Sequence, residues 1–147
     1  MKPSQFFNEE QKKNITDAIK EAELNTSGEI RLHIESDCKE DVLDRAAYMF
    51  EKLAIHKTEL RNGVLFYLSI KDRKFAILGD AGINAVTPDN FWEEIKETVL
   101  NHFKKNEFDT GLSTGIKMAG QALKEHFPYQ KDDVNELSDE ISFGKEN

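Results

Sequence analysis

The sequence has 147 residues, about one domain by the usual length of domains, and a chain of this size buries roughly 68–70% of its unfolded surface. Hydrophobic residues make up 38% of the chain, which excludes disorder throughout, and 20 Lys and Arg against 28 Asp and Glu give a net charge of −8. This acidic balance argues against a nucleic-acid partner, because such binding depends on basic groups that displace counterions, and it favours cations as ligands.

The single cysteine, Cys38, excludes an internal disulfide framework and fits a reducing compartment. The N-terminus has no apolar run typical of a signal peptide, and no 18-residue apolar stretch occurs. The sequence therefore predicts a soluble, cytoplasmic, monomeric single-domain protein.

The first two elements are predicted from capping and periodicity. Asn8, followed three residues later by Gln11, is typical of a capping box. Apolar residues then recur at helical spacing, which predicts a helix that ends near Asn25. From Glu29 to Glu35 apolar and polar residues alternate, which predicts a strand with Glu29, Arg31, His33 and Glu35 on its solvated face.

The next elements form a crossover and a hairpin. Helical spacing predicts a helix over about 41–55, and the run 64–68 is apolar on both sides, as expected for a central strand covered on both faces. The first strand, this helix and the second strand form a right-handed parallel crossover. The short polar segment before 75–78 predicts a hairpin, so the third strand is antiparallel to the second. Helices must then cover both faces of a mixed sheet.

Two more helices and a tail complete the chain. Residues 79–85 are predicted to form a loop, after which Thr87 caps a helix that has Pro88 at its first position and runs to about 104. A last helix opens near Asp109 and is stopped by Pro128. The predicted domain spans residues 1–127, and the acidic segment 128–147 is expected to be loosely docked or mobile.

A candidate metal site follows from the hairpin. If the third strand is antiparallel to the second, the loop after it lies beside the starts of the first and second strands. Carboxylate and amide oxygens from three loops then converge, which is the chemistry that calcium and magnesium prefer. The predicted metal ligands are Glu29, Asn62, Asp80, Asn84 and Asp89.

Simpler roles exist for each of these residues. Asp89 is favoured near a helix N-terminus without any ligand, Glu29 fits a solvated strand position, and Asn62 and Asp80 are typical of turns. A rival acidic cluster is expected at the opposite end of the sheet, where ligands of parallel sheets usually bind, although one of its members would also cap the second helix. It comprises Asp37, Glu40, Asp41 and Asp72.

No catalytic motif is present. The sequence lacks phosphate-binding glycine-rich loops, H-E-x-x-H and G-x-S-x-G. Cys38 and Arg45 miss the spacing of a cysteine-based phosphatase loop, so Cys38 is expected to be buried and inert. The four histidines, His33 among them, fall in separate elements, and each is expected to be structural.

Several stretches taken together resemble the TPM domain family, in particular its stand-alone members from marine Bacteroidetes. Their order and spacing carry the resemblance, which covers about residues 5–127. The stretches are Thr26–Ile30, Arg61–Leu65, Asp72–Lys74, Gly79–Ile83 leading to Asp89, and Glu107–Leu112.

The resemblance implies an α/β/α sandwich related to Rossmann-like folds, calcium or magnesium binding in an acidic pocket, and an acid phosphatase activity like that of a plant thylakoid member. The family's Asn-Gly falls on Asn62 and its helix-start acid on Asp89. The chain departs from the family at Asn84, where a glutamate is frequent, and at Asp80, where an aromatic residue is usual.

Three hypotheses about function follow. The first is a divalent-metal-binding domain that takes Ca²⁺ or Mg²⁺. The second is a metal-dependent acid phosphatase acting on phosphate monoesters, in which the same ion activates water. The third is a protein-interaction module that uses the acidic tail.

Overall fold

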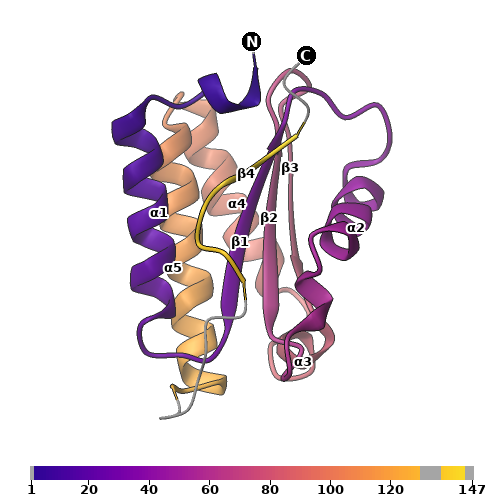
Figure 1. The fold of residues 1–147 in the computed structure, drawn as a ribbon, viewed down its shortest axis with the longest axis vertical. Helices are drawn as coiled ribbons and strands as arrows, with labels where there is room; N and C mark the ends of the chain where they lie inside the picture. Colours follow the sequence, from indigo (N-terminus) through magenta and orange to yellow (C-terminus); the bar gives the residue numbers. More distant parts are fainter. Residues whose placement is uncertain (1, 130–136, 145–147) are drawn as a thin grey trace.

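The computed structural model describes residues 2–129 and 137–144. Figure 1 shows the helices and strands in this part of the chain. They are η1 (Pro3–Gln5), α1 (Glu9–Glu23), β1 (Glu29–Glu35), α2 (Val42–Lys52), η2 (Ile55–Lys57), β2 (Gly63–Ser69), β3 (Lys74–Gly79), α3 (Ala81–Asn84), α4 (Phe91–Lys104), α5 (Phe108–His126) and β4 (Ser142–Phe143).

The sheet has the order β3-β2-β1-β4. β1 and β2 are parallel and are joined through α2, whereas β2 and β3 form an antiparallel hairpin. The parallel crossover and the hairpin predicted from the sequence are therefore confirmed. β2 is buried along its whole length, as expected for a strand with a neighbour on each side and helices on both faces.

Helices cover both faces of the sheet, so the molecule is an α/β/α sandwich (Figure 1). α1, α4 and α5 lie on one face, where Ile30, Leu32 and Phe66 join the larger hydrophobic core. α2 lies on the other face, where its Ala46 packs with Tyr67 in a smaller core. Because successive side chains of a strand point to opposite faces of the sheet, alternate residues pack into the larger core and the smaller core.

The ends of the first two helices follow from local backbone chemistry. At the start of α1, the Asn8 side chain accepts from Gln11 N at 2.8 Å and the Gln11 side chain accepts from Asn8 N at 3.0 Å, which confirms the capping box. α2 ends at Lys52, earlier than predicted. The reason is Ala54, whose φ of 60° is left-handed and cannot continue a helix.

The predicted loop 79–85 contains the short helix α3, which Asp80 caps by accepting from Ala81 N. α4 begins at Phe91, not at Pro88. Thr87 does not cap α4, because its hydroxyl donates to Ile83 O at 3.0 Å and thereby closes α3. Thr87 and Pro88, which predicted the start of a helix, therefore lie in the turn between α3 and α4.

β4 is a strand that the sequence analysis does not predict. It pairs in parallel with β1, with His33 opposite Ser142 and Ile34 opposite Phe143. Ile141 and Phe143 are partly buried against the larger core, so residues 137–144 are docked on the sheet edge. The remainder of the predicted tail, at 130–136 and 145–147, lies outside the described residues.

None of the helices in the described part of the chain is both long enough and apolar enough to cross a membrane.

Candidate functional site

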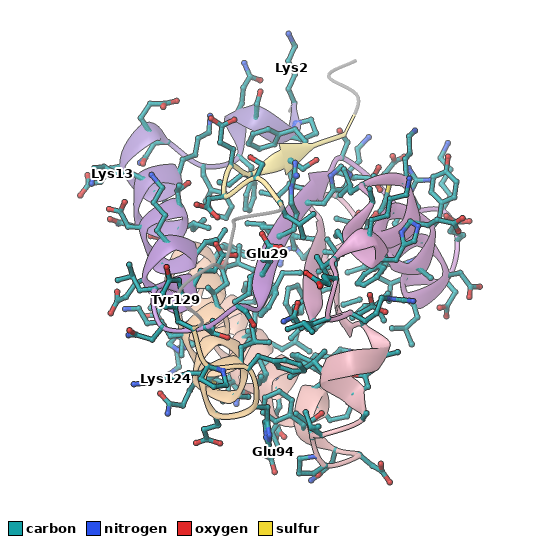
Figure 2. All side chains as sticks on the ribbon, turned by 60° about the horizontal axis from the view of Figure 1, so that its bottom comes forward. Lys2, Lys13, Glu29, Glu94, Lys124 and Tyr129 are labelled. Carbon is teal, nitrogen blue, oxygen red and sulfur yellow. The ribbon has the colours of Figure 1, made fainter. Side chains whose placement is uncertain are left out.

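Three loops meet at the edge of the sheet where β1 and β2 begin and β3 ends. Asp80 N donates to Gly63 O at 3.0 Å, and Glu29 N lies 3.4 Å from Asn62 O, to which it donates. These backbone bonds hold the starts of the two parallel strands against the end of β3, as the hairpin topology predicts. Figure 2 turns this end forward and labels Glu29 on β1.

Glycine at position 82 is required for this meeting of loops. Its N–H donates to Arg61 O at 2.8 Å. A Cβ at position 82 would lie 2.2 Å from Leu60 O and 2.6 Å from Arg61 O, which are backbone atoms that cannot rotate away. The glycine therefore allows α3 to approach the loop before β2 closely.

Three of the five predicted ligands are buried at this edge. Glu29 is 3% exposed, Asn62 is 1% exposed and Asp80 is 6% exposed. The simpler interpretation of Glu29 as a solvated strand residue is therefore wrong. Buried polar groups of this kind are costly unless they have partners, so the contacts of each side chain decide what the edge can bind.

Asp80 has a cationic partner already. Arg61 forms a bidentate pair with it, with Nε 2.7 Å from Oδ2 and Nη2 2.8 Å from Oδ1. Oδ1 also accepts from Ala81 N at 2.7 Å, which caps α3. The carboxylate raises the pKa of the Arg61 guanidinium through the hydrogen bond and through its charge. A protein cation thus neutralises this acid in the structure.

Glu29 lies in an acidic neighbourhood. Its Oε1 accepts from Leu137 N at 2.6 Å, so it also helps to dock the segment before β4. Nearby, Glu23 accepts from Ile30 N at 2.7 Å. Burial raises the pKa of Glu23 to about 10, with further contributions from a hydrogen bond to Asp139 and from the negative charges of Asp139 and Glu29. Glu23 is therefore protonated at neutral pH in this arrangement.

The other predicted ligands make different contacts. Asn62 Nδ2 donates to Ser27 Oγ at 3.4 Å. Asn84 is exposed, with Oδ1 accepting from Trp92 Nε1 at 2.7 Å and Nδ2 donating to Gly79 O at 2.8 Å. Asp89 is exposed in the turn before α4. The structure therefore brings Glu29, Asn62 and Asp80 to one buried edge, with Asn84 and Asp89 nearer the solvent.

Within residues 2–129 and 137–144, no group of three or more His, Cys, Asp and Glu side chains is arranged to hold a metal ion. The predicted set includes two asparagines, so it does not depend on acids and histidines alone. Any ion at this edge would thus combine carboxylate oxygens with amide oxygens and water.

The rival cluster at the opposite end fastens loops together. Asp41 caps α2, accepting from Leu43 N at 2.9 Å. Asp72 accepts from Cys38 N, and Cys38 is buried as predicted. Lys74 Nζ donates to the carbonyl oxygens of Cys38 and Glu40 at 3.1 and 3.2 Å. These contacts give the acids structural roles in joining the loop after β1 to the β2–β3 hairpin.

A buried polar network on β1 is the feature that sequence reasoning missed. His33 is 2% exposed and Glu35 is 8% exposed, although alternation predicts both on a solvated face. Glu35 accepts from Tyr67 Oη at 2.5 Å and from Arg45 Nε and Nη2 at 2.8 and 2.7 Å. The signal available in the sequence is Tyr67, because a tyrosine in a fully buried strand needs a partner for its hydroxyl.

The network has a defined charge state. Burial opposes ionisation of Glu35, but hydrogen bonds from Arg45 and Tyr67, together with the neighbouring His33 ring, outweigh it and lower the pKa of this carboxyl well below its usual range. Burial, followed by the hydrogen bond to Glu35 and the charge of that carboxylate, raises the pKa of Tyr67. Glu35 is thus a carboxylate and Tyr67 a neutral donor.

This network borders a cavity of about 810 Å³ between α2 and the carboxyl end of β1. Ligands of parallel sheets bind at this end. Its lining combines cations, acids, hydroxyls and apolar groups, among them Arg45, Lys52, Lys71, Glu35, Asp37, Ser142 and Phe143.

Comparisons with known proteins agree with this fold. The TPM domain family model matches residues 1–122. The NMR structure of BA42 from the psychrophilic bacterium Bizionia argentinensis is 46% identical, with a TM-score of 0.89, and the match covers 95% of this chain and 97% of that one. No curated protein matches the chain.

Two more distant structures share the fold. The N-terminal domain of a P. gingivalis protein is 18% identical with a TM-score of 0.69, over 86% of this chain and 84% of that one. The N-terminal domain of the cg2496 protein from Corynebacterium glutamicum is 12% identical with a TM-score of 0.65, and the match covers 80% of this chain and 74% of that one. Together with the family model, which spans most of the sequence, the BA42 match shows that this chain belongs to the TPM domain family.

Proposed function

We propose that this TPM domain is a cytoplasmic divalent-cation-binding protein whose ion, Ca²⁺ or Mg²⁺, links the loops at the start of β1, the start of β2 and the end of β3. The observation that supports this most is the burial of Glu29, Asn62 and Asp80, from three separate loops, at one edge of the sheet. Hard cations take carboxylate and amide oxygens together with water. Asn84 and Asp89 complete the proposed set on the solvent side.

Binding at this edge is an exchange of cations. Arg61 holds both oxygens of Asp80, and the Arg61 side chain is about half exposed, so it has room to swing into solvent. A divalent ion would take its place and bring twice the charge to the same acids. Because the guanidinium must leave first, it weakens the apparent affinity for the ion.

Calorimetric titration of the chelator-stripped protein with CaCl₂ and MgCl₂ tests the proposal. Asp80→Asn keeps the cap of α3 but loses a charged ligand, so we expect the affinity to fall at least about tenfold, and Asp89→Asn to weaken binding less. Arg61→Asn, which tolerates the left-handed backbone at that position (φ 52°), should bind the ion more tightly than the wild type.

The matched control is Asp109→Asn, which removes an acid from the first turn of α5. It should leave the affinity unchanged. If Asp80→Asn and Asp89→Asn both bind the ion as the wild type does, the ion is not held at this edge. If instead Asp72→Asn alone abolishes binding, the ion belongs to the opposite end of the sheet.

Hydrolysis of phosphate monoesters is the second candidate, because the family is designated a phosphatase family. In this reaction the bound ion would polarise the phosphate and activate water. We expect metal-dependent release of 4-nitrophenol from 4-nitrophenyl phosphate that is abolished in the Asp80→Asn/Asp89→Asn double variant. Turnover that persists in that variant or in excess EDTA would exclude this mechanism.

A further inference from the structure

Ser142, His33 and Glu35 form a connected row at the cavity beside α2. The Ser142 hydroxyl lies 2.8 Å from His33 Nδ1. The other ring nitrogen, Nε2, lies 3.4 Å from Glu35 Oε2. All three residues line the same cavity of about 810 Å³. A hydroxyl, an imidazole and a carboxylate in this order are the parts of a catalytic triad, which is recognised by geometry and not by position in the sequence.

The carboxylate determines which ring nitrogen carries the proton. Arg45 and Tyr67 hold Glu35 in place, and Arg45 compensates its charge. A carboxylate facing Nε2 favours the tautomer with hydrogen on Nε2, which leaves the lone pair of Nδ1 directed at the Ser142 hydroxyl. His33 is thereby arranged to act as a base toward Ser142.

A purely structural histidine does not account for this arrangement. Within the described residues His33 Nε2 is buried without a hydrogen-bond partner, and the nearest acceptor given for it is Glu35 Oε2 at 3.4 Å. Buried polar atoms are normally satisfied. Protonation of Nδ1 would create an imidazolium directly beside Glu35, so the site is preorganised for the charge that appears when a serine is deprotonated.

The cavity indicates the class of substrate. Lys52 and Lys71 line it, and neither has an ion pair with another described residue. The acids of the lining are Glu35, which pairs with Arg45, and Asp37, so the two lysines outnumber the remaining acid. Met49, Leu53 and Phe143 add apolar surface. This lining suits an acyl group that has a short apolar chain and an anionic end.

We propose that Ser142 is the nucleophile of a serine hydrolase site that cleaves carboxylic esters with an anionic acyl group, with His33 as the general base and Glu35 positioning His33. This activity is separate from cation binding at the other end of the sheet. Lys52 and Lys71 are the cations available to bind the anionic end.

The reaction balances with water as the second substrate. Ser142 Oγ forms a bond to the carbonyl carbon while its proton moves to His33 Nδ1. The bond from carbon to the alcohol oxygen breaks, and the alcohol takes that proton. Water then attacks the acyl-serine, loses a proton to His33 Nδ1, and releases the acid as the proton returns to Ser142.

A fluorophosphonate probe tests the nucleophile on the full chain in EDTA, which separates this test from any effect of a bound cation. The Ser142 oxygen should displace fluoride from phosphorus, and mass spectrometry of the digested protein should place the adduct on Ser142. We expect Ser142→Ala to abolish labelling and His33→Gln to slow it at least about 100-fold. Ser138→Ala, a serine of the same segment, should label like the wild type.

Turnover tests the substrate class. The hemisuccinate ester of 4-nitrophenol should be cleaved faster than its butyrate ester by at least about tenfold, and Lys71→Met should reduce that preference. Folding of each variant is checked by its melting curve and its circular dichroism. If folded wild type is not labelled at Ser142, or folded His33→Gln labels at the wild-type rate, the proposal is wrong. Equal cleavage of the two esters would overturn the assigned substrate class.

Discussion

At the scale of single residues, the protein relies on groups whose environment is unusual for their type. Asp80 is a buried acid with an arginine partner, Glu35 is a buried acid with an arginine and a tyrosine, and Glu23 is a half-buried acid that keeps its proton. Arginine partners compensate the charges of Asp80 and Glu35, whereas burial is the main reason that Glu23 keeps its proton.

Glu23 gives the protein a stability that depends on pH. Its folded pKa of about 10 lies above the ordinary value of 4.5. Its contribution is therefore fully present below about pH 4.5 and is lost as the pH rises toward 10. Between pH 6 and pH 9 in EDTA, the free energy of unfolding of the wild type should fall by up to about 1.4 kcal/mol per pH unit relative to that of Glu23→Gln. Urea unfolding measures the difference, and parallel pH profiles would contradict the assignment.

Gly82 provides a second prediction at this scale. Gly82→Ala places a methyl group against two carbonyl oxygens of the loop before β2. We expect a loss of roughly 1–3 kcal/mol in the free energy of unfolding, which is typical of overpacking. Ala85→Ser, at an exposed position of the same segment, is the control and should be within about 0.5 kcal/mol of the wild type. A stable Gly82→Ala would mean that the loops are less tightly joined.

At the scale of elements, the strongly periodic segments were predictable and the exceptions have local causes. Helices α1, α4 and α5 and the hairpin follow from apolar spacing and turn residues. α3 could not be predicted, because four residues are too few to show a period. β4 was missed because a two-residue strand has no pattern of its own and depends on pairing with β1.

The candidate site shows the same division. The meeting of three loops was predictable from the direction of β3, so Glu29, Asn62 and Asp80 were correctly placed at one edge. The pairing of Asp80 with Arg61 was not, because nothing in the spacing of these residues indicates a shared hydrogen bond. The burial of His33 and Glu35 was also missed, since alternation along β1 cannot tell solvent from a cavity.

Removal of β4 tests how much this edge contributes. A chain shortened to end at residue 136 loses the partly buried Ile141 and Phe143, whereas one that ends at residue 144 keeps them. We expect the shorter chain to remain folded, with a free energy of unfolding about 1–3 kcal/mol lower than that of the full sequence, because it no longer buries this apolar surface. The longer chain should match the full sequence in urea unfolding. Equal stability of the two shortened chains would show that the edge strand contributes nothing.

At the scale of the whole molecule, the two ends of the sheet carry different chemistry. The end where β1 and β2 begin gathers acids and amides from three loops, and the carboxyl end opens into a cavity with cations and a hydroxyl. The single sheet holds both ends in fixed relation, because β1 contributes Glu29 to one and His33 to the other.

Cation binding should therefore stabilise the entire fold. An ion that binds only the folded state raises the free energy of unfolding by about 2.7 kcal/mol when its concentration is one hundred times the Kd. Calcium should raise the melting temperature of the wild type, and EDTA should reverse the increase. Calcium should raise the melting temperature of the Asp80→Asn/Asp89→Asn double variant far less. An equal increase in the double variant and the wild type would place the ion elsewhere.

The parallel pairing of β4 with β1 also bears on how the protein is made. Ser142 meets His33 across 109 residues of sequence, whereas β1, β2 and β3 are all complete once residue 79 has been synthesised. During translation the edge of β1 that pairs with β4 therefore stays unpaired until residue 144 has left the ribosome. Exposed strand edges are where nascent chains associate, so this edge is where a chaperone would act before the last strand is added.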